Sequence, residues 1–210
     1  MELVDAREQE NEASDLCGLL RDIVLKSEAA VLVGHGLAVP LALRVASELK
    51  LPVVLSNGPI RQLDPVVRTL ALLPESLLSG VFLRAGFLNR WMASSLGMRR
   101  VVVNPYVMDR DTVALLLEPI VQSAASRRMA ARWIRSLPSL LELPPCDGFE
   151  LLLVWGDDDR FYPLAEAEFL LETASQGQLS TIEGGRYFHP VERPWELADA
   201  VGAFLEAHSL

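Results

Sequence analysis

The order of apolar and polar positions along the chain predicts alternating strands and helices at both ends of the sequence. Three short, largely apolar runs at 30–33, 51–55 and 149–155 are typical of parallel strands buried on both faces, and 178–182 is interpreted as a fourth strand. Apolar residues recur at helical spacing in four further segments, at 12–26, 37–49, 163–173 and 194–208. Strands and helices that alternate in this way favour an α/β fold with a parallel sheet of about four strands.

The middle of the chain has a different pattern. Between residues 61 and 146 helical periodicity predominates, interrupted by prolines and glycines, and only Val101–Val103 is ambiguous. We therefore expect a core formed by 1–60 and 147–210, with 61–146 inserted as a helical cap or lid.

Composition and charge narrow the range of partners. The 210 residues are 50% hydrophobic and carry a net charge of −9 without a basic stripe, so nucleic acid and anionic membranes are not expected partners. The first 15 residues are acidic and polar, and no run of 18 apolar residues exists, so we expect a cytoplasmic, bacterial-type protein without a transmembrane segment.

No motif in the sequence implies a cofactor or a metal ion. Cys17 and Cys146 form no CxxC pair and no Cys/His cluster, which argues against a zinc site or a disulfide framework. The run 157–159 of three aspartates is interpreted as an acidic turn at a strand end and not as a metal site. The sequence also lacks a P-loop and a GxGxxG motif.

A strand-to-helix turn at 34–38, with the sequence GHGLA, lies where a nucleophile elbow would be. That device holds a serine in the pattern G-x-S-x-G, with small flanking residues because the strand and helix backbones nearly touch. Here Gly36 stands at the serine position. Glycine permits the turn, but without a side chain it cannot form an acyl-enzyme.

Three segments together resemble α/β-hydrolase-fold proteins. VLVGHGLAVPLALRVASEL resembles the elbow and the following helix, and LLLVWGDDDRFYP resembles a late strand with the pattern G-x-x-D-x-x-x-P. LSTIEGGRYFHPVERPWELADAV resembles the final strand, the histidine loop and the closing helix. The resemblance implies a partial α/β-hydrolase-like parallel sheet with an inserted helical cap, in which the superfamily's N-terminal strands are missing. It also places the family's acid at Asp159.

The departures from this family pattern concern the catalytic triad. Aligning Glu192-Arg193-Pro194 with the family's pattern puts Tyr187 at the position of the catalytic histidine. Tyrosine has an ordinary pKa of about 10 and is a poor base at neutral pH. His189 lies two residues further on and is a candidate displaced base. The Leu37 amide would be the remaining half of the oxyanion hole. The triad at positions Gly36, Asp159 and Tyr187 is therefore degenerate, because only its acid is retained.

A ligand pocket can be expected under the cap. Residues 76–92 are rich in large apolar side chains, which suit a pocket for an apolar small molecule, a lipid-contacting surface or ordinary packing on the core. Around the elbow, the candidate pocket residues are His35, Leu37, Tyr187 and Trp155, of which His35 and Trp155 also suit packing roles.

The run Ala30–Val33 becomes an edge strand if the family topology is retained. An apolar, unpaired edge promotes aggregation unless it is covered, so we expect a homo-oligomer or a heteromeric protein partner at this strand.

Three functions remain open at this point. The first is a non-catalytic α/β-hydrolase-like protein, a pseudohydrolase, that acts as a binding or assembly subunit. The second is a hydrolase of an ester-like small molecule, with a partner-completed site or one based on His189 and Asp159. The third is a lipid-surface protein that acts through the cap.

Overall fold

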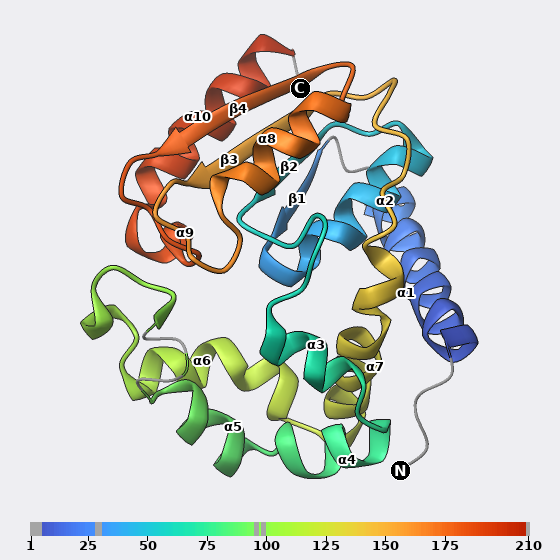
Figure 1. Ribbon diagram of the computed structural model, residues 1–210, viewed down its shortest axis with the longest axis vertical. Coiled ribbons are helices and arrows are strands. Elements are labelled where there is room, and N and C mark those ends of the chain that lie inside the picture. Colours follow the sequence, from blue (N-terminus) through green and yellow to red (C-terminus); the bar gives the residue numbers. More distant parts are fainter. Residues whose placement is uncertain (1–5, 28–30, 95–96, 98–99, 209–210) are drawn as a thin grey trace.

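The computed structural model describes residues 6–27, 31–94, 97 and 100–208 and contains one parallel sheet (Figure 1). Its strands are β1 (Leu32–His35), β2 (Val53–Ser56), β3 (Leu151–Gly156) and β4 (Gly177–Ile182), in the spatial order β1-β2-β3-β4. All three strand pairs are parallel. The expected α/β fold with a parallel sheet of four strands is therefore confirmed.

The helices fall into two groups. Those outside the insertion are α1 (Ala6–Ser27), which packs on α2 and α7, and α2 (Val39–Leu49), α8 (Leu164–Thr173), α9 (His189–Glu192) and α10 (Pro194–Ala207), with the 3-10 turn η1 (Gly36–Ala38) before α2. Those between β2 and β3 are α3 (Pro65–Ala71), α4 (Glu75–Leu77), the π-helical turn η2 (Leu78–Phe82), α5 (Ala85–Met92), the 3-10 turn η4 (Pro105–Val107), α6 (Arg110–Val121) and α7 (Ala124–Leu140).

Strand side chains alternate between two cores on opposite faces of the sheet. Leu55 and Leu153 pack with α2 and α8 on one face, whereas Val54 and Val154 pack with α10 on the other. All four of these residues are buried, which explains why β2 and β3 appear in the sequence as largely apolar runs.

β1 lies at an edge of the sheet, since it pairs with β2 alone among the described residues. The observed strand begins two residues later than expected, and Ala30 lies outside the described residues. Val33 is in register with Val54 and so shares the face that α10 covers. The side chain of Val33 is nevertheless 59% exposed, which leaves an apolar side chain open at this edge.

The helical segment between β2 and β3 lies below the sheet in Figure 1 and has a hydrophobic core of its own, centred on Leu78, Met108 and Val113. Val101–Val103, the ambiguous stretch, forms bends and not a strand. Among the described residues no single helix has the length and apolar composition needed to cross a membrane. The helices Pro65–Ala71 and Glu75–Phe82 reach that length and composition only when they are taken together, and the chain bends by 116° between them.

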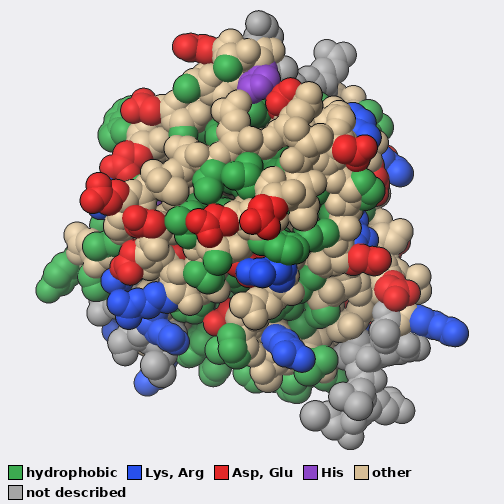
Figure 2. Space-filling model, turned by 45° about the horizontal axis from the view of Figure 1, so that its top comes forward, with side chains coloured by type: hydrophobic (Ala, Val, Ile, Leu, Met, Phe, Trp, Pro, Cys, Tyr) green, Lys and Arg blue, Asp and Glu red, His purple; other side chains and the backbone are tan. Residues whose placement is uncertain are grey.

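Charge is divided unevenly between the two parts of the chain. Residues 61–146 contain 11 basic and 6 acidic residues, a net charge of +5, so the remaining residues contain 8 basic and 22 acidic ones. Figure 2 shows the consequence on one face of the molecule, where acidic side chains predominate in the upper part and basic ones gather mainly in the lower part. The cap is thus electropositive relative to the core.

Candidate functional site

The turn after β1 has the tight geometry that an elbow requires. Gly36 has a φ of +60°, a conformation that residues with a side chain rarely adopt. A Cβ at Gly34 would lie 2.7 Å from the Cβ of Ala42 and 3.2 Å from Cδ2 of Leu55. The strand, the turn and α2 therefore approach one another as closely as their backbones allow, which explains the two glycines of the sequence.

The phenol of Tyr187 fills the space in which a side chain at Gly36 would lie. A Cβ added there would overlap the Tyr187 hydroxyl and lie 2.8 Å from its Cζ. The Tyr187 ring centroid lies 5.1 Å from that of His35 and 5.8 Å from that of Tyr162. Burial raises the pKa of Tyr187 above its ordinary value, and the hydrogen bond from the Leu37 N–H opposes this shift. The structure thus brings Gly36, Leu37 and Tyr187 together, with the phenol protonated at neutral pH.

Asp159 is buried and is held by an asparagine and a backbone amide. Its Oδ2 accepts a hydrogen bond of 2.7 Å from Nδ2 of Asn57, and its Oδ1 accepts one of 2.8 Å from the Phe161 N–H. Asn57 Oδ1 in turn accepts a hydrogen bond of 2.8 Å from the Gly156 N–H. Burial raises the pKa of Asp159, and the hydrogen bonds from Phe161 and Asn57 oppose that shift.

Asn57, like Ser56, is a residue of this site that the sequence pattern did not single out. It directly follows β2 and is fully buried, with a φ of 29°. A polar residue immediately after an apolar strand was the available signal, because side chains at the carboxyl ends of parallel strands meet at one edge of the sheet. The sequence Ser56-Asn57-Gly58-Pro59 is equally typical of an ordinary turn that ends a strand, so the pattern alone does not single out Asn57.

His189, the candidate displaced base, is completely buried and directed at Ser56. Its Nε2 lies 2.7 Å from Ser56 Oγ, which also lies 3.2 Å from Nδ1 of His35. Burial, together with the neighbouring His35, lowers the pKa of His189 to about 3. Burial also lowers the pKa of His35 to about 4, against the effect of its hydrogen bond to Ser56. Both rings are therefore neutral near pH 7.

The other aspartates and Trp155 are engaged in structural contacts. Asp157 Oδ1 accepts a hydrogen bond of 2.7 Å from the Gly184 N–H, and Asp158 Oδ2 lies 2.9 Å from Nε of Arg186. Trp155 is completely buried and donates from Nε1 to the Tyr162 carbonyl at 2.7 Å.

A cavity of about 250 Å³ lies between the core and the cap, directly beside the elbow. Of the four candidate pocket residues, Leu37 and Tyr187 line it, whereas His35 and Trp155 do not. Most of its lining is apolar, and half of the lining residues come from α3, α5, α6 and α7, namely Val66, Val67, Leu70, Leu88, Trp91, Met92, Leu117, Ile120 and Ile134. Two charged residues, Asp64 and Arg100, also border it. This arrangement suits a small molecule with an apolar body.

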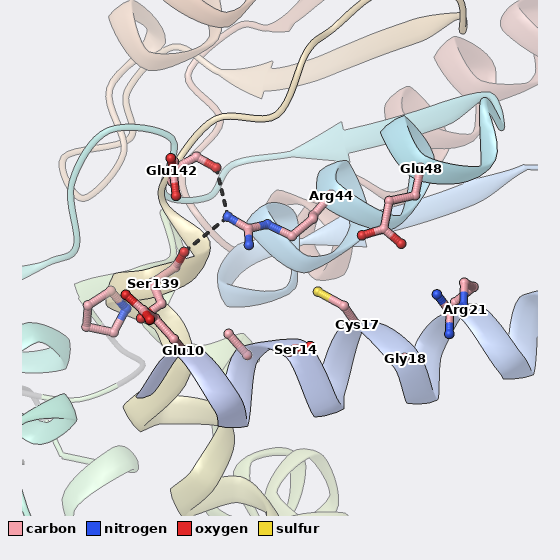
Figure 3. Close-up of a pocket in the computed structure, with 11 residues that line it drawn as sticks. Glu10, Ser14, Cys17, Gly18, Arg21, Arg44, Glu48, Ser139 and Glu142 are labelled. Carbon is pink, nitrogen blue, oxygen red and sulfur yellow. Dashed lines mark hydrogen bonds between the residues drawn. The ribbon is translucent and has the colours of Figure 1, made fainter. Parts of the chain in front are cut away.

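A second cavity of about 400 Å³ lies between α1, α2 and α7 and has a polar lining (Figure 3). Nη2 of Arg44 donates hydrogen bonds to the carbonyl oxygens of Ser139 and Glu142, at 3.1 and 3.0 Å. Cys17 also lines this cavity, and burial raises the pKa of its thiol. Arg44, one of the two arginines that line this cavity, is thus already bonded to the protein, and the cavity lies away from the elbow. We therefore place the candidate site under the cap.

The comparisons with known proteins bear on the fold. No protein-family model and no curated protein sequence matches the chain. Similar solved structures include an alpha/beta hydrolase fold protein from Burkholderia ambifaria, with a TM-score of 0.67 and 18% identity over 88% of this chain and 70% of that one. A thermophilic esterase from Thermogutta terrifontis has a TM-score of 0.63 and 20% identity over 95% of this chain and 72% of that one.

A further similar structure is the 2-hydroxy-6-oxo-6-phenylhexa-2,4-dienoate hydrolase of a Rhodococcus species. It has a TM-score of 0.55 and 18% identity over 84% of this chain and 62% of that one. At these identities the likeness shows that this chain shares their fold.

Proposed function

We propose that this chain, which has the α/β-hydrolase fold, acts as a binding and assembly subunit and not as a hydrolase. The observation that carries the proposal is the phenol of Tyr187 in the space of a side chain at Gly36. A nucleophile cannot be placed at that position without moving the ring, and a protonated phenol is a poor base.

The alternative hydrolase, based on His189 and Asp159, has less support. The two residues are held by adjacent but different residues, His189 by Ser56 and Asp159 by Asn57. A histidine whose pKa is about 3 accepts a proton poorly near pH 7, and His189 does not line the cavity.

The ligand under this proposal is a small molecule with an apolar body, bound in the cavity beside Tyr187. Trp91 and Tyr162 line the cavity with the aliphatic side chains of the cap, so binding replaces water by apolar contact. Since the described residues place no serine, cysteine or histidine in the lining of the cavity, the ligand would be retained unchanged.

Binding of 1-octanol tests this assignment, with isothermal titration calorimetry and tryptophan fluorescence as readouts because Trp91 lines the cavity. Ile120 is half-buried on α6 and borders the cavity, so Ile120→Trp should weaken octanol binding by at least about tenfold. Leu115, on the same helix and 69% exposed, supplies the matched control: Leu115→Trp should leave octanol binding unchanged.

An esterase assay provides the outcome that contradicts the proposal. We expect no turnover of p-nitrophenyl butyrate by the wild-type chain. Turnover that Ile120→Trp abolishes and Leu115→Trp retains would place hydrolysis in the cavity and overturn the non-catalytic assignment.

We further propose that the chain associates through β1, with a second copy or another protein adding a strand to it. The support is the edge position of β1 and the exposure of Val33, which α10 leaves open although it covers the same face of the sheet further in. Strand addition satisfies the unpaired backbone groups of an edge and removes it as a template for aggregation.

A further inference from the structure

We propose that the cavity under the cap selects a monocarboxylate with an apolar body, and that the guanidinium of Arg100 receives the carboxylate. This inference rests on the proposed binding function and adds the chemical class of the ligand. The juxtaposition that carries it is an exposed guanidinium on the wall of an otherwise almost wholly apolar cavity.

Arg100 has no carboxylate partner in the described part of the chain. Its guanidinium lies 5.4 Å from the centroid of the Phe161 ring, a cation–π contact that positions the group while leaving its N–H donors available. Other arginines around the core are paired: Arg186 lies 2.9 Å from Asp158 and Arg61 lies 2.8 Å from Glu166. Arginine recognises carboxylates through paired N–H donors, so a ligand carboxylate is the partner that this geometry lacks.

The other charged residue of the cavity, Asp64, is committed to the protein. Its Oδ1 accepts hydrogen bonds from the backbone N–H groups of Val66 and Val67, at 2.9 and 3.4 Å, and so caps the first turn of α3. The helix N-terminus stabilises this negative charge. Arg100 is therefore the charged group of the lining that is available to a ligand.

The segment that carries Arg100 is anchored to the loop that carries Tyr187. The carbonyl of Val101 accepts a hydrogen bond of 3.0 Å from the Phe188 N–H, and that of Val102 accepts one of 3.0 Å from Nη1 of Arg186. The carboxylate of Glu192 accepts hydrogen bonds from the next two backbone amides, those of residues 103 and 104, at 2.9 and 2.7 Å. These bonds hold Arg100 at the rim of the cavity, so less conformational entropy is lost when a ligand binds.

Charge and size agree with this class of ligand. The cap, with a net charge of +5, attracts an anion that the strongly acidic core would repel. A cavity of 250 Å³ equals about eight times the ~30 Å³ that one water molecule occupies in the liquid, so it holds about eight non-hydrogen atoms. Octanoate, with its chain inside and its carboxylate on Arg100, matches both measures.

The test compares octanoate with 1-octanol at pH 7.5, by calorimetry on the intact chain. We expect the wild type to bind octanoate about tenfold more tightly than octanol. Arg100→Gln should abolish this preference and leave octanol binding unchanged. Arg90→Gln, which replaces an exposed arginine of α5 that does not line the cavity, should retain the preference.

The outcomes separate the two proposals. Equal binding of octanol and octanoate by the wild type, or an octanoate preference that survives Arg100→Gln, overturns the carboxylate assignment and leaves the binding function standing. If the wild type binds neither compound, or if Ile120→Trp leaves octanol binding unchanged, the proposed binding function itself fails.

Discussion

A hydroxyl that occupies the space of an absent side chain makes two residues depend on each other. Gly36 is required both by its positive φ and by the phenol of Tyr187, so the two requirements can be separated by substitution. The φ requirement is a property of position 36 alone, whereas the steric requirement disappears with the phenol.

We expect Gly36→Ala to lower the free energy of unfolding by about 2–4 kcal/mol, from steric overlap together with the left-handed backbone. In a Tyr187→Leu background, only the backbone cost of about 1–2 kcal/mol should remain. Urea unfolding of the four proteins in this cycle measures the coupling. Gly202→Ala, in the interior of α10 with open space around it, should instead stabilise by about 0.5–1 kcal/mol. An equal cost of Gly36→Ala in both backgrounds would contradict the steric role of Tyr187.

The buried histidines predict a loss of stability in mild acid. The pKa of His189 in the folded chain is about 3, below the ordinary 6.5, so at pH 5 the unfolded chain binds a proton that the folded chain does not. The contribution of the neutral His189 to the free energy of unfolding is fully present above pH 6.5 and is lost as the pH falls toward 3. Between pH 7.5 and 5 this amounts to about 2 kcal/mol.

Urea unfolding at pH 7.5 and 5 checks the sign of this effect. His189→Gln should reduce the decline by about 2 kcal/mol, because a glutamine does not titrate. His208→Gln, outside the buried cluster, should leave the decline in place. A decline that is identical in wild type and His189→Gln would contradict a buried, neutral His189.

At the scale of elements, the sequence predicted most of the fold because its signals were local. The four predicted strand segments were within two residues of the observed strands, and helical spacing located α2, α8 and α10. α1 begins at Ala6, six residues earlier than its apolar stripe, because its first turns are held by ion pairs to α7 and not by hydrophobic contacts alone.

The contacts of the candidate site could be predicted only in part. The alignment of Tyr187 with a histidine position placed its ring near the elbow, but the overlap of its hydroxyl with a side chain at Gly36 depends on tertiary geometry. The pairing of Asp159 with Asn57 joins residues 102 positions apart, and no local pattern encodes it. The direction of His189, toward Ser56, likewise depends on a turn that forms the short helix α9.

The attachment of α1 to α7 gives a prediction for these elements. Arg135 is buried and lies 2.8 Å from Glu8 and 3.4 Å from Glu12, which is also buried. Burial raises the pKa of Glu12, and the Arg135 charge opposes that shift. Arg135→Ala would leave Glu12 without its closest buried partner, so we expect the free energy of unfolding to fall by about 3–5 kcal/mol.

Arg132 supplies the control, since it also bridges to α1 but is more exposed. It lies 2.8 Å from Asp15, which is exposed, and 3.9 Å from Glu12. Arg132→Ala should cost no more than about 1 kcal/mol in urea unfolding. Equal costs for the two variants would mean that burial of the Arg135 pair does not matter.

At the scale of the whole molecule, the division of charge separates the two surfaces to which we assign functions. The cap, with its excess of arginines, surrounds most of the cavity, while the acidic core holds the sheet and its open edge. The proposed ligand binding and the proposed association would therefore involve different surfaces. Substitutions at β1 should leave binding of octanol unaffected, and substitutions in the cavity should leave association unaffected.

Association through β1 is tested with Val33→Lys in native mass spectrometry of the purified chain. A lysine on an edge strand opposes strand addition, because its charged group would lose water beside the side chains of the added strand. If two copies pair at β1, the wild type should have twice the 23.2 kDa mass of the chain, and Val33→Lys should weaken dimerisation by at least about tenfold.

Since Val33 is 59% exposed, the variant should fold normally. Leu115→Lys places the same charge on an exposed position of α6 and should leave the dimer intact. A wild type that is monomeric at micromolar concentration would contradict pairing between copies, and the edge would then have to be covered by a different protein.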